Sequence, residues 1–208
     1  MTSPLPNLYL ITDRHQVHET WTFLELVEEL LCSGIGMVQL REKDLSAAEL
    51  LPLALKMRAL TDKYACRLLI NDRIDVAQAV AADGVHLGHH SLPVAAARKI
   101  LGESSLIGVS THSPEEIVEA HQQGADFVTY GPVFYTPSKG GMGDPVGIES
   151  LRTVCQNSQL PVYALGGIKR SNCREIVQTA AHGIAVISAL MAVEEPQAAY
   201  QHLVEQLS

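Results

Sequence analysis

Three long polar side chains occupy alternate positions within one short predicted strand and just after it. They are Gln39, Arg41 and Lys43, and alternate residues of a strand project from the same face. Buried strands are usually lined with apolar side chains, and a charge inside a protein is rarely left unpaired. We therefore expect this face to bind an anionic or polar ligand. The alternative is a cluster of salt bridges with Glu42 or Asp72.

A second group of polar side chains ends the next predicted strand. Asn71 and Asp72 close residues 67–72. A carboxylate in this place suits a divalent cation, and the neighbouring amide suits a contact with the ligand. The alternative is a simple turn, because Asn and Asp side chains form the local hydrogen bonds that turns favour.

The longest irregular stretch of the chain combines hydroxyls, a lysine and glycines. Residues 134–147 read FYTPSKGGMGDPVG, which is longer than a routine connection. Thr136, Ser138 and Lys139 precede two glycines, whose backbone N–H groups can approach a ligand closely. Such a set can clamp a phosphate or diphosphate group. A plain flexible loop is the alternative.

Histidines follow two other predicted strands. His112 comes shortly after Ser110, beside a predicted helix start, and a histidine that titrates near neutrality suits general acid–base catalysis. Hydrogen bonding within the loop is the alternative. The adjacent His89 and His90 are interpreted as polar lining, because neighbouring residues rarely bind one metal ion and no Glu or Cys at zinc spacing accompanies them.

The elements that must position these side chains alternate along the chain. Amphipathic helical segments separate eight predicted strands, several of them apolar on both faces as covered parallel strands are. In 208 residues this predicts an α/β fold, a single (β/α)8 TIM barrel over residues 1–208. A doubly wound open sheet is disfavoured because no GxGxxG follows the first strand, and an unclosed α/β sandwich is a further alternative. The predicted strands are residues 8–12, 37–42, 67–72, 84–88, 106–110, 127–133, 161–167 and 183–189.

Local signals mark the ends of several elements. Ser113 with Glu116 predicts a capped helix start, as does Ser46 with Glu49, although Pro52 is expected to shift the start of the second of these helices. A short sequence motif, in which a glycine-containing turn leads into an apolar strand, occurs three times. Its copies are residues 81–87, 123–130 and 180–186.

A barrel would bring the polar positions together, because its functional side chains gather where the strands end at their carboxyl termini. Each polar group above lies at or just after the end of a predicted strand. Gly166, Gly167 and Ser188 end the last two strands, where barrels commonly bind phosphate.

Composition limits the classes of function. Hydrophobic residues make up 47% and charged residues 18% of the chain, as in a soluble globular protein. No apolar run long enough for a membrane span and no signal-peptide pattern is present. The four cysteines form no CxxC pair, which favours a reducing cytoplasm. A net charge of −8 argues against binding nucleic acid but allows a small phosphorylated ligand. A homo-oligomer stays open.

Several motifs in order resemble one family. YLITDR, VQLREKD, LLINDRIDVAQAVAADGVHLG, GVSTHSPEE, GADFVTYGPVFYTPSK, ALGGI and AVISAL are similar to those of the thiamine phosphate synthases and of their relatives, the TenI-type thiazole tautomerases. The resemblance implies a (β/α)8 barrel of thiamine biosynthesis. The synthase joins hydroxymethylpyrimidine diphosphate to a thiazole phosphate carboxylate and releases diphosphate with the help of Mg²⁺. The tautomerase isomerises the thiazole phosphate before that step.

The resemblance also implies roles for individual residues. Gln39, Arg41 and Lys43 match contacts with the pyrimidine and the diphosphate, and Asn71 matches a further diphosphate contact. Asp72 matches the first carboxylate that binds Mg²⁺.

The remaining matches lie further along the chain. Ser110 matches a contact on the pyrimidine side. Thr136, Ser138 and Lys139 match a Thr-x-Thr-Lys loop that grips the thiazole carboxylate and the diphosphate. The residues that match the phosphate site of the thiazole are Gly167, Ile187 and Ser188.

One position departs from the family pattern. After HLG the synthases read Gln-Glu-Asp, with the Asp as second Mg²⁺ ligand, whereas this chain reads His89-His90-Ser91. A serine hydroxyl supplies no negative charge, so Asp72 alone would hold the metal together with substrate phosphates and water. Ser91 would instead cap the helix that begins near Pro93.

The synthase and the tautomerase require different residues in the site. The tautomerase needs no metal and uses the histidine that His112 matches, so the missing carboxylate favours it. The retained Arg41 and Lys43 favour the synthase, which has a diphosphate to grip. We predict the synthase, with Mg²⁺ on Asp72 and with Arg41, Lys43, Lys139 and His112 as catalytic candidates. The alternatives are the tautomerase and a non-catalytic barrel that binds a phosphorylated ligand.

Overall fold

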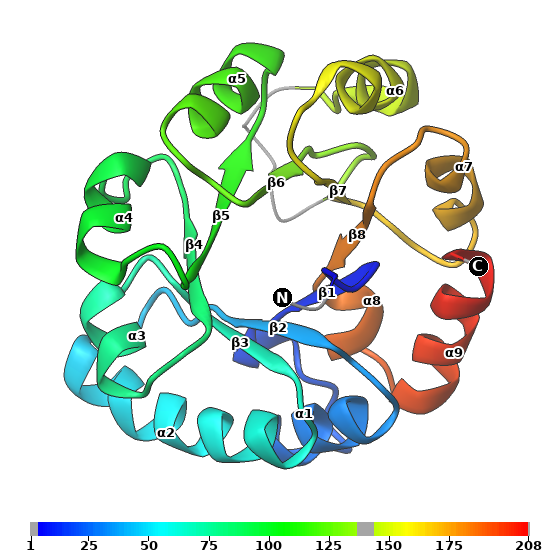
Figure 1. The fold of residues 1–208 in the computed structure, drawn as a ribbon. Coiled ribbons are helices and arrows are strands. Elements are labelled where there is room, and N and C mark those ends of the chain that lie inside the picture. Colours follow the sequence, from blue (N-terminus) through cyan, green and yellow to red (C-terminus); the bar gives the residue numbers. More distant parts are fainter. Residues whose placement is uncertain (1–3, 137–143, 208) are drawn as a thin grey trace.

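Eight parallel strands close into one barrel in sequence order (Figure 1). The structure is a computed structural model, and it describes residues 4–136 and 144–207. Each strand pairs with the next, and the last pairs with the first, so the predicted (β/α)8 barrel is confirmed and an open sheet is excluded. The strands are β1 Leu8–Ile11, β2 Met37–Leu40, β3 Arg67–Asn71, β4 Gly84–Leu87, β5 Leu106–Thr111, β6 Phe127–Tyr130, β7 Val162–Leu165 and β8 Gly183–Val186.

Helices surround the strands, as Figure 1 shows. Two short helical turns, η1 Arg14–Gln16 and α8 Ser188–Met191, follow the first and last strands. No helix in the described part of the chain is long and apolar enough to cross a membrane. The longer elements are α1 Phe23–Cys32, α2 Ala47–Lys63, α3 Ile74–Ala79, α4 Val94–Leu101, α5 Pro114–Gln122, α6 Gly147–Asn157, α7 Cys173–Val177 and α9 Pro196–Leu207.

The predicted capping residues start two of these helices. The Ser113 hydroxyl accepts a hydrogen bond from the backbone N–H of Glu116 at the start of α5. Ser46 and Glu49 form a reciprocal capping box on α2. The expectation about Pro52 is wrong, because α2 begins at Ala47 and continues through the proline. The two capping bonds satisfy N–H groups at the helix start, which lies more than a turn before the ring of the proline.

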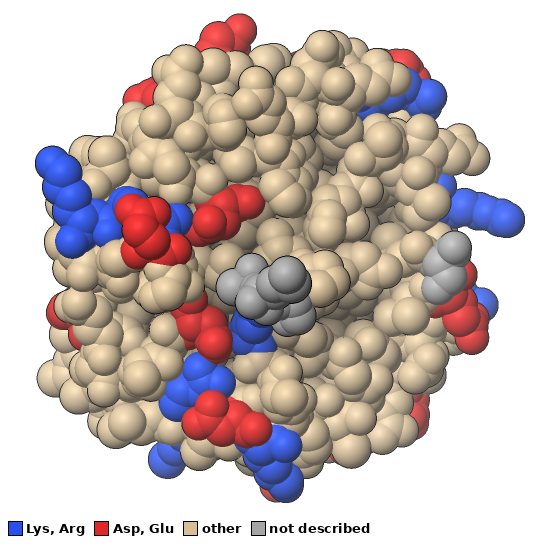
Figure 2. All heavy atoms as spheres, viewed as in Figure 1, with Lys and Arg blue, Asp and Glu red and all other residues tan. Residues whose placement is uncertain are grey.

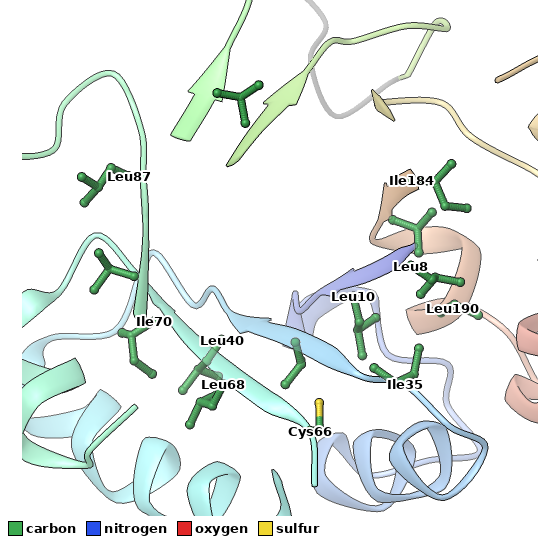
Figure 3. Packing of buried hydrophobic residues seen from close by; sticks show 14 of the residues in the cluster. Leu8, Leu10, Ile35, Leu40, Cys66, Leu68, Ile70, Leu87, Ile184 and Leu190 are labelled. Atoms are coloured by element: carbon green, nitrogen blue, oxygen red, sulfur yellow. The ribbon is translucent and has the colours of Figure 1, made fainter. Parts of the chain in front are cut away.

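Two apolar cores support the strands. The larger core lies between the strands and the helices, where Leu40, Leu68 and Ile70 point away from the barrel axis (Figure 3). The smaller core fills the barrel and contains the aromatic rings of Tyr9, Phe127 and Tyr163, whose centroids lie 5.5 to 5.8 Å apart. Because both faces of the strands are buried, the barrel is a packed scaffold and not a pore.

Two copies of the recurring motif, at residues 81–87 and 123–130, anchor strands at their amino ends. Asp83 and Asp126 precede β4 and β6, and each carboxylate accepts a hydrogen bond from a backbone N–H of the preceding strand, at 2.8 and 2.7 Å. Each also pairs with an arginine at 2.7 Å, Arg58 for Asp83 and Arg98 for Asp126. In Figure 2 acidic and basic side chains lie side by side on one face of the barrel. The repetition is therefore a structural device at the end opposite the predicted site.

Candidate functional site

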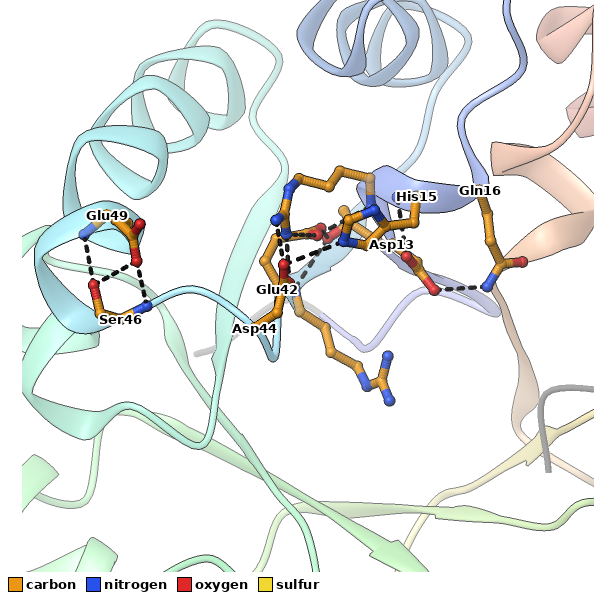
Figure 4. A network of polar contacts seen from close by, with 10 residues as sticks. Asp13, His15, Gln16, Glu42, Asp44, Ser46 and Glu49 are labelled. Carbon is orange, nitrogen blue, oxygen red and sulfur yellow. Dashed lines mark hydrogen bonds and ion pairs between the residues drawn. The ribbon is translucent and has the colours of Figure 1, made fainter. Parts of the chain in front are cut away.

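A hydrogen-bonded network fixes the carboxyl ends of β1 and β2 (Figure 4). The Thr12 hydroxyl accepts from the backbone N–H of Arg41 at 3.0 Å and donates to Glu42 at 2.7 Å. Glu42 is buried, and its other oxygen accepts from the backbone N–H and the guanidinium of Arg14 at 3.0 and 3.2 Å. Arg14, and not Arg41, therefore neutralises the buried carboxylate.

This network ends the strand earlier than the sequence predicts. The ladder of β2 stops at Leu40, because the Thr12 side chain replaces a main-chain partner for Arg41. Beyond this point the Asp44 carboxylate pairs with Arg14 and with His15, and the guanidinium holds the pKa of Asp44 well below its usual range. Arg14 therefore engages both Glu42 and Asp44, and neither carboxylate pairs with Arg41 or Lys43.

The cations Arg41 and Lys43 lie together without an anionic partner. Within residues 4–136 and 144–207 neither side chain forms a hydrogen bond or an ion pair. Burial lowers the pKa of Arg41, with weaker compensation from the charges of Asp13 and Glu42. The charge of Arg41 is the largest cause of a lowered pKa at Lys43, and Asp72 only partly offsets it. The alternative of a salt-bridged cluster is therefore wrong, and this pair suits a ligand with several negative charges.

Asn71 and Asp72 lie on the neighbouring corner. Asp72 follows β3 with φ of 63°, a left-handed conformation that Asp tolerates better than most residues but that still costs free energy. Its backbone N–H donates to the carbonyl of His86 at 2.9 Å, while its exposed carboxylate accepts no hydrogen bond among the described residues. An unengaged carboxylate that acts electrostatically on Lys43 is chemically suited to a divalent cation.

A row of hydrogen-bonded polar side chains crosses the barrel interior near the ends of β2 and β3. The Gln39 amide donates to the Tyr9 hydroxyl at 2.9 Å, and that hydroxyl lies 3.3 Å from Nδ1 of His86. Nε2 of His86 lies 3.0 Å from the hydroxyl of the half-buried Ser110. The sequence motifs predict Gln39 and Ser110 as site residues, whereas they do not predict Tyr9 and His86. Their signal is a polar group in the middle of otherwise apolar strands, LYLI and GVHL.

The buried His86 gives the folded protein a predictable response to acid. Burial, with the charge of Arg41, lowers the pKa of His86 to about 3, so the native state stays neutral where an unfolded chain binds a proton. Stability is therefore expected to fall by roughly 1 kcal/mol per pH unit as the pH drops from about 6.5 towards the native pKa. Denaturant unfolding at several pH values measures the slope. His86→Gln, which does not titrate, should show a shallower slope, and an unchanged slope would refute this assignment.

At the carboxyl end of β7, the backbone at Gly167 packs directly against the backbone of the segment that follows β6. Gly167 follows β7 with φ of 63°, and a Cβ there would lie 2.5 Å from the carbonyl oxygen of Tyr135. Only glycine lets the segment before Thr136 pack this closely against the end of β7. Ser138 and Lys139 lie outside the described residues, so their placement stays a prediction.

The short helix α8 begins directly after β8. Ile187 directly precedes α8 and packs against the apolar core inside the barrel, and the exposed Ser188 begins the helix. The first N–H groups of a helix lack intrahelical acceptors and favour an anion. Because β8 pairs with β1, this start lies next to the corner that carries η1.

His112 is held at one ring nitrogen. Its Nδ1 lies 2.5 Å from the carbonyl oxygen of Gly131, and its backbone N–H donates to Glu116 at 2.7 Å. A carbonyl only accepts, so Nδ1 carries the proton and Nε2 is left to exchange one with a ligand. The loop contact is present at one nitrogen, and the acid–base role at the other nitrogen stays a prediction.

The sequence matches the family model described as thiamine monophosphate synthase over residues 8–190. The chain belongs to the thiamine monophosphate synthase family. A putative thiamine-phosphate synthase of Geobacter sulfurreducens is 52% identical over 92% of this chain and 89% of its own length. The thiamine-phosphate synthase of Clostridium novyi is 40% identical over 94% and 96%. The solved thiamine phosphate pyrophosphorylase of Pyrococcus furiosus is 38% identical, with a TM-score of 0.87 over 97% and 95%.

This member of the thiamine monophosphate synthase family uses Ser91 for a turn. The Ser91 hydroxyl accepts from the backbone N–H of Gly88 at 2.8 Å, so it closes the turn after β4. The expectation that Ser91 caps the next helix is wrong, because Pro93 precedes α4 and no side chain caps that helix. His89 and His90 are exposed and pack ring to ring at 5.2 Å. In the described ranges no three acidic, His or Cys side chains gather as a metal site.

Proposed function

We propose that this protein is a thiamine-phosphate synthase, which condenses hydroxymethylpyrimidine diphosphate with thiazole phosphate or its carboxylate to give thiamine phosphate and diphosphate. The observation that carries the proposal is the pair of cations just after β2, neither of which has a side-chain partner among residues 4–136 and 144–207. Arg41 and Lys43 repel each other in the absence of an anion, and a diphosphate supplies the charges that they lack. Family membership gives the reaction class.

The residues of this chain contribute mainly position and charge. The thiazole nitrogen forms a bond to the pyrimidine methylene as the bond from that carbon to the diphosphate oxygen breaks. Arg41 and Lys43, with Lys139, stabilise the negative charge that develops on the leaving diphosphate. Asn71 would contact the same group. The fixed strand ends hold the two substrates in line, which replaces covalent catalysis by the protein.

The other matched residues would hold the rings and the second phosphate. Gln39 and Ser110, which are linked through Tyr9 and His86, would lie on the pyrimidine side. Thr136 and Ser138 would contact the thiazole carboxylate and diphosphate. The phosphate of the thiazole would lie against Gly167, Ile187 and Ser188.

The residues present fit one Mg²⁺ ion. Asp72 offers an exposed carboxylate with no other hydrogen bond among the described residues, next to the cations that would hold the diphosphate. Mg²⁺ keeps several waters and is commonly held by one or two carboxylates together with substrate phosphates. When bound, the ion would supply additional positive charge to the leaving diphosphate.

Product detection tests the proposal. The purified protein is incubated with both substrates, with Mg²⁺ or with EDTA, and thiamine phosphate is measured. Formation of thiamine phosphate that depends on Mg²⁺ is the expected result. Thiamine phosphate absent under both conditions would contradict it, and tight binding of thiazole phosphate in that case would indicate a non-catalytic barrel.

A second candidate is the thiazole tautomerase, which two observations favour. Ser91 supplies no second metal carboxylate, and its hydroxyl is already engaged in a turn. His112 keeps Nε2 available for proton transfer. This activity predicts isomerisation of the thiazole phosphate carboxylate at the same rate with and without EDTA, and its loss in His112→Gln.

A further inference from the structure

The hydrogen bonds across the barrel interior have a direction that donor and acceptor chemistry fixes. The Gln39 amide nitrogen carries only donors, so the oxygen of Tyr9 accepts from it at 2.9 Å. The Tyr9 hydroxyl has one proton of its own, and burial raises the pKa of this phenol well above its ordinary value, so the proton stays. That proton is directed at Nδ1 of His86, 3.3 Å away.

The next step fixes the tautomer of His86. An imidazole nitrogen that accepts a hydrogen bond carries no proton, and a neutral ring then bears its proton on the other nitrogen. His86 is buried, and Arg41 adds a positive charge nearby, so the ring stays neutral. The proton is consequently on Nε2, which donates to the Ser110 oxygen at 3.0 Å.

Ser110 is left with a hydroxyl proton that no residue in the described part of the chain accepts. Within the described residues His86 is the only hydrogen-bond partner of its side chain. Thr129 lies opposite Ser110 in the β5–β6 register, and its buried hydroxyl has no hydrogen-bond partner there. Ser110 is half-buried, beside the corners that carry Arg41 and Asp72. Its O–H therefore remains free to donate into the site.

We propose that Tyr9 and His86 are positioning residues that turn the hydroxyl proton of Ser110 toward the ligand, so that Ser110 favours a lone-pair acceptor on the bound heterocycle. The assignment rests on the proposed function, in which Ser110 lies on the pyrimidine side. A pyrimidine ring nitrogen is such an acceptor. A ring that presents an N–H at that position could donate only to the second lone pair of the Ser110 oxygen and would leave the serine proton without an acceptor among the described residues, which is unfavourable.

Nitrogen NMR of the protein labelled with ¹⁵N-histidine tests the tautomer directly. The expected result is one neutral ring with its proton on Nε2, whose signals are absent from the His86→Gln spectrum. A His86 ring protonated on Nδ1 would overturn the proposal. In Gln39→Glu, a carboxylate would accept from Tyr9 and reverse the chain, so the proton is expected to move to Nδ1. This measurement needs no turnover, so its outcome is independent of the proposed reaction.

A double-mutant cycle tests the functional consequence. Tyr9→Phe is expected to raise KM for the pyrimidine substrate by about tenfold, with little change in KM for the thiazole, because the hydrogen bond that sets the direction at Ser110 is lost together with the acceptor of the Gln39 amide. In the Ser110→Ala background the same substitution should change KM less than about twofold. Equal effects in both backgrounds would contradict a role through Ser110.

Tyr163→Phe is the matched control for this cycle. Tyr163 belongs to the same interior core, with its ring centroid 5.8 Å from that of Tyr9, but its hydroxyl donates to the carbonyl of Pro6 at the amino end. The control loses one buried phenol hydrogen bond without touching the chain to Ser110. It should leave both KM values unchanged. A tenfold rise in the control would identify general loosening of the core as the cause and would overturn the proposal.

Discussion

Arg41→Met is expected to lower kcat/KM for thiamine phosphate formation by about a thousandfold and to leave the protein at least as stable as the wild type. The guanidinium is half-buried and has no ion pair among the described residues, so the charges of Asp13 and Glu42 return only part of the free energy that its burial costs. Methionine keeps the apolar stem and removes that cost. Activity falls because the leaving diphosphate loses its most deeply placed cation.

Steady-state kinetics and denaturant unfolding measure the two halves of this prediction. Since Arg41 is the largest cause of the lowered pKa of Lys43, that pKa should rise in the variant, which NMR of the lysine side chain detects. Arg73→Met is the control, because Arg73 lies on the next corner but is paired with Asp75 at 2.9 Å. Activity of Arg41→Met within tenfold of the wild type would refute the assignment of the diphosphate site.

The second large effect is expected for Asp72→Asn, with at least a hundredfold loss of kcat at a fixed Mg²⁺ concentration. The amide supplies no negative charge for the cation, so the Mg²⁺ concentration for half-maximal activity should rise as well. Asparagine tolerates the left-handed backbone of this position as well as aspartate does, so the unfolding free energy should change little.

Titration of activity with Mg²⁺ checks the role of Asp72. Asp75→Asn removes a carboxylate three positions away that is engaged by Arg73, and it should behave like the wild type. A mutant Asp72→Asn with an unaltered Mg²⁺ requirement would remove Asp72 from the metal site. Ser91→Asp offers the reverse experiment, in which a restored second carboxylate should lower the Mg²⁺ requirement.

Local sequence patterns are sufficient to predict the barrel fold and the end of the barrel that carries the candidate site. Apolar runs separated by amphipathic segments predict parallel strands under helices, and Ser113 and Ser46 predict helix starts because capping depends only on residues within one turn. The gathering of Arg41, Lys43 and Asp72 could also be predicted, since closure of the barrel places all carboxyl ends at one rim.

Contacts between distant segments could not be predicted in the same way. The sequence places Glu42 beside two cations, yet the turn after β2 directs it to Arg14 from another corner. The interior chain needs Tyr9 and His86, 77 positions apart, to meet across the closed barrel. The spacing of residues within a single strand cannot predict this contact between two strands. For Ser138 and Lys139 the assignment stays a prediction from the motif.

The aspartate anchors Asp83 and Asp126 hold the strands from the end opposite the site, with arginine partners that belong to neither substrate pocket. Substitutions at these anchors are therefore expected to change how much folded protein accumulates, with the rate per active molecule preserved.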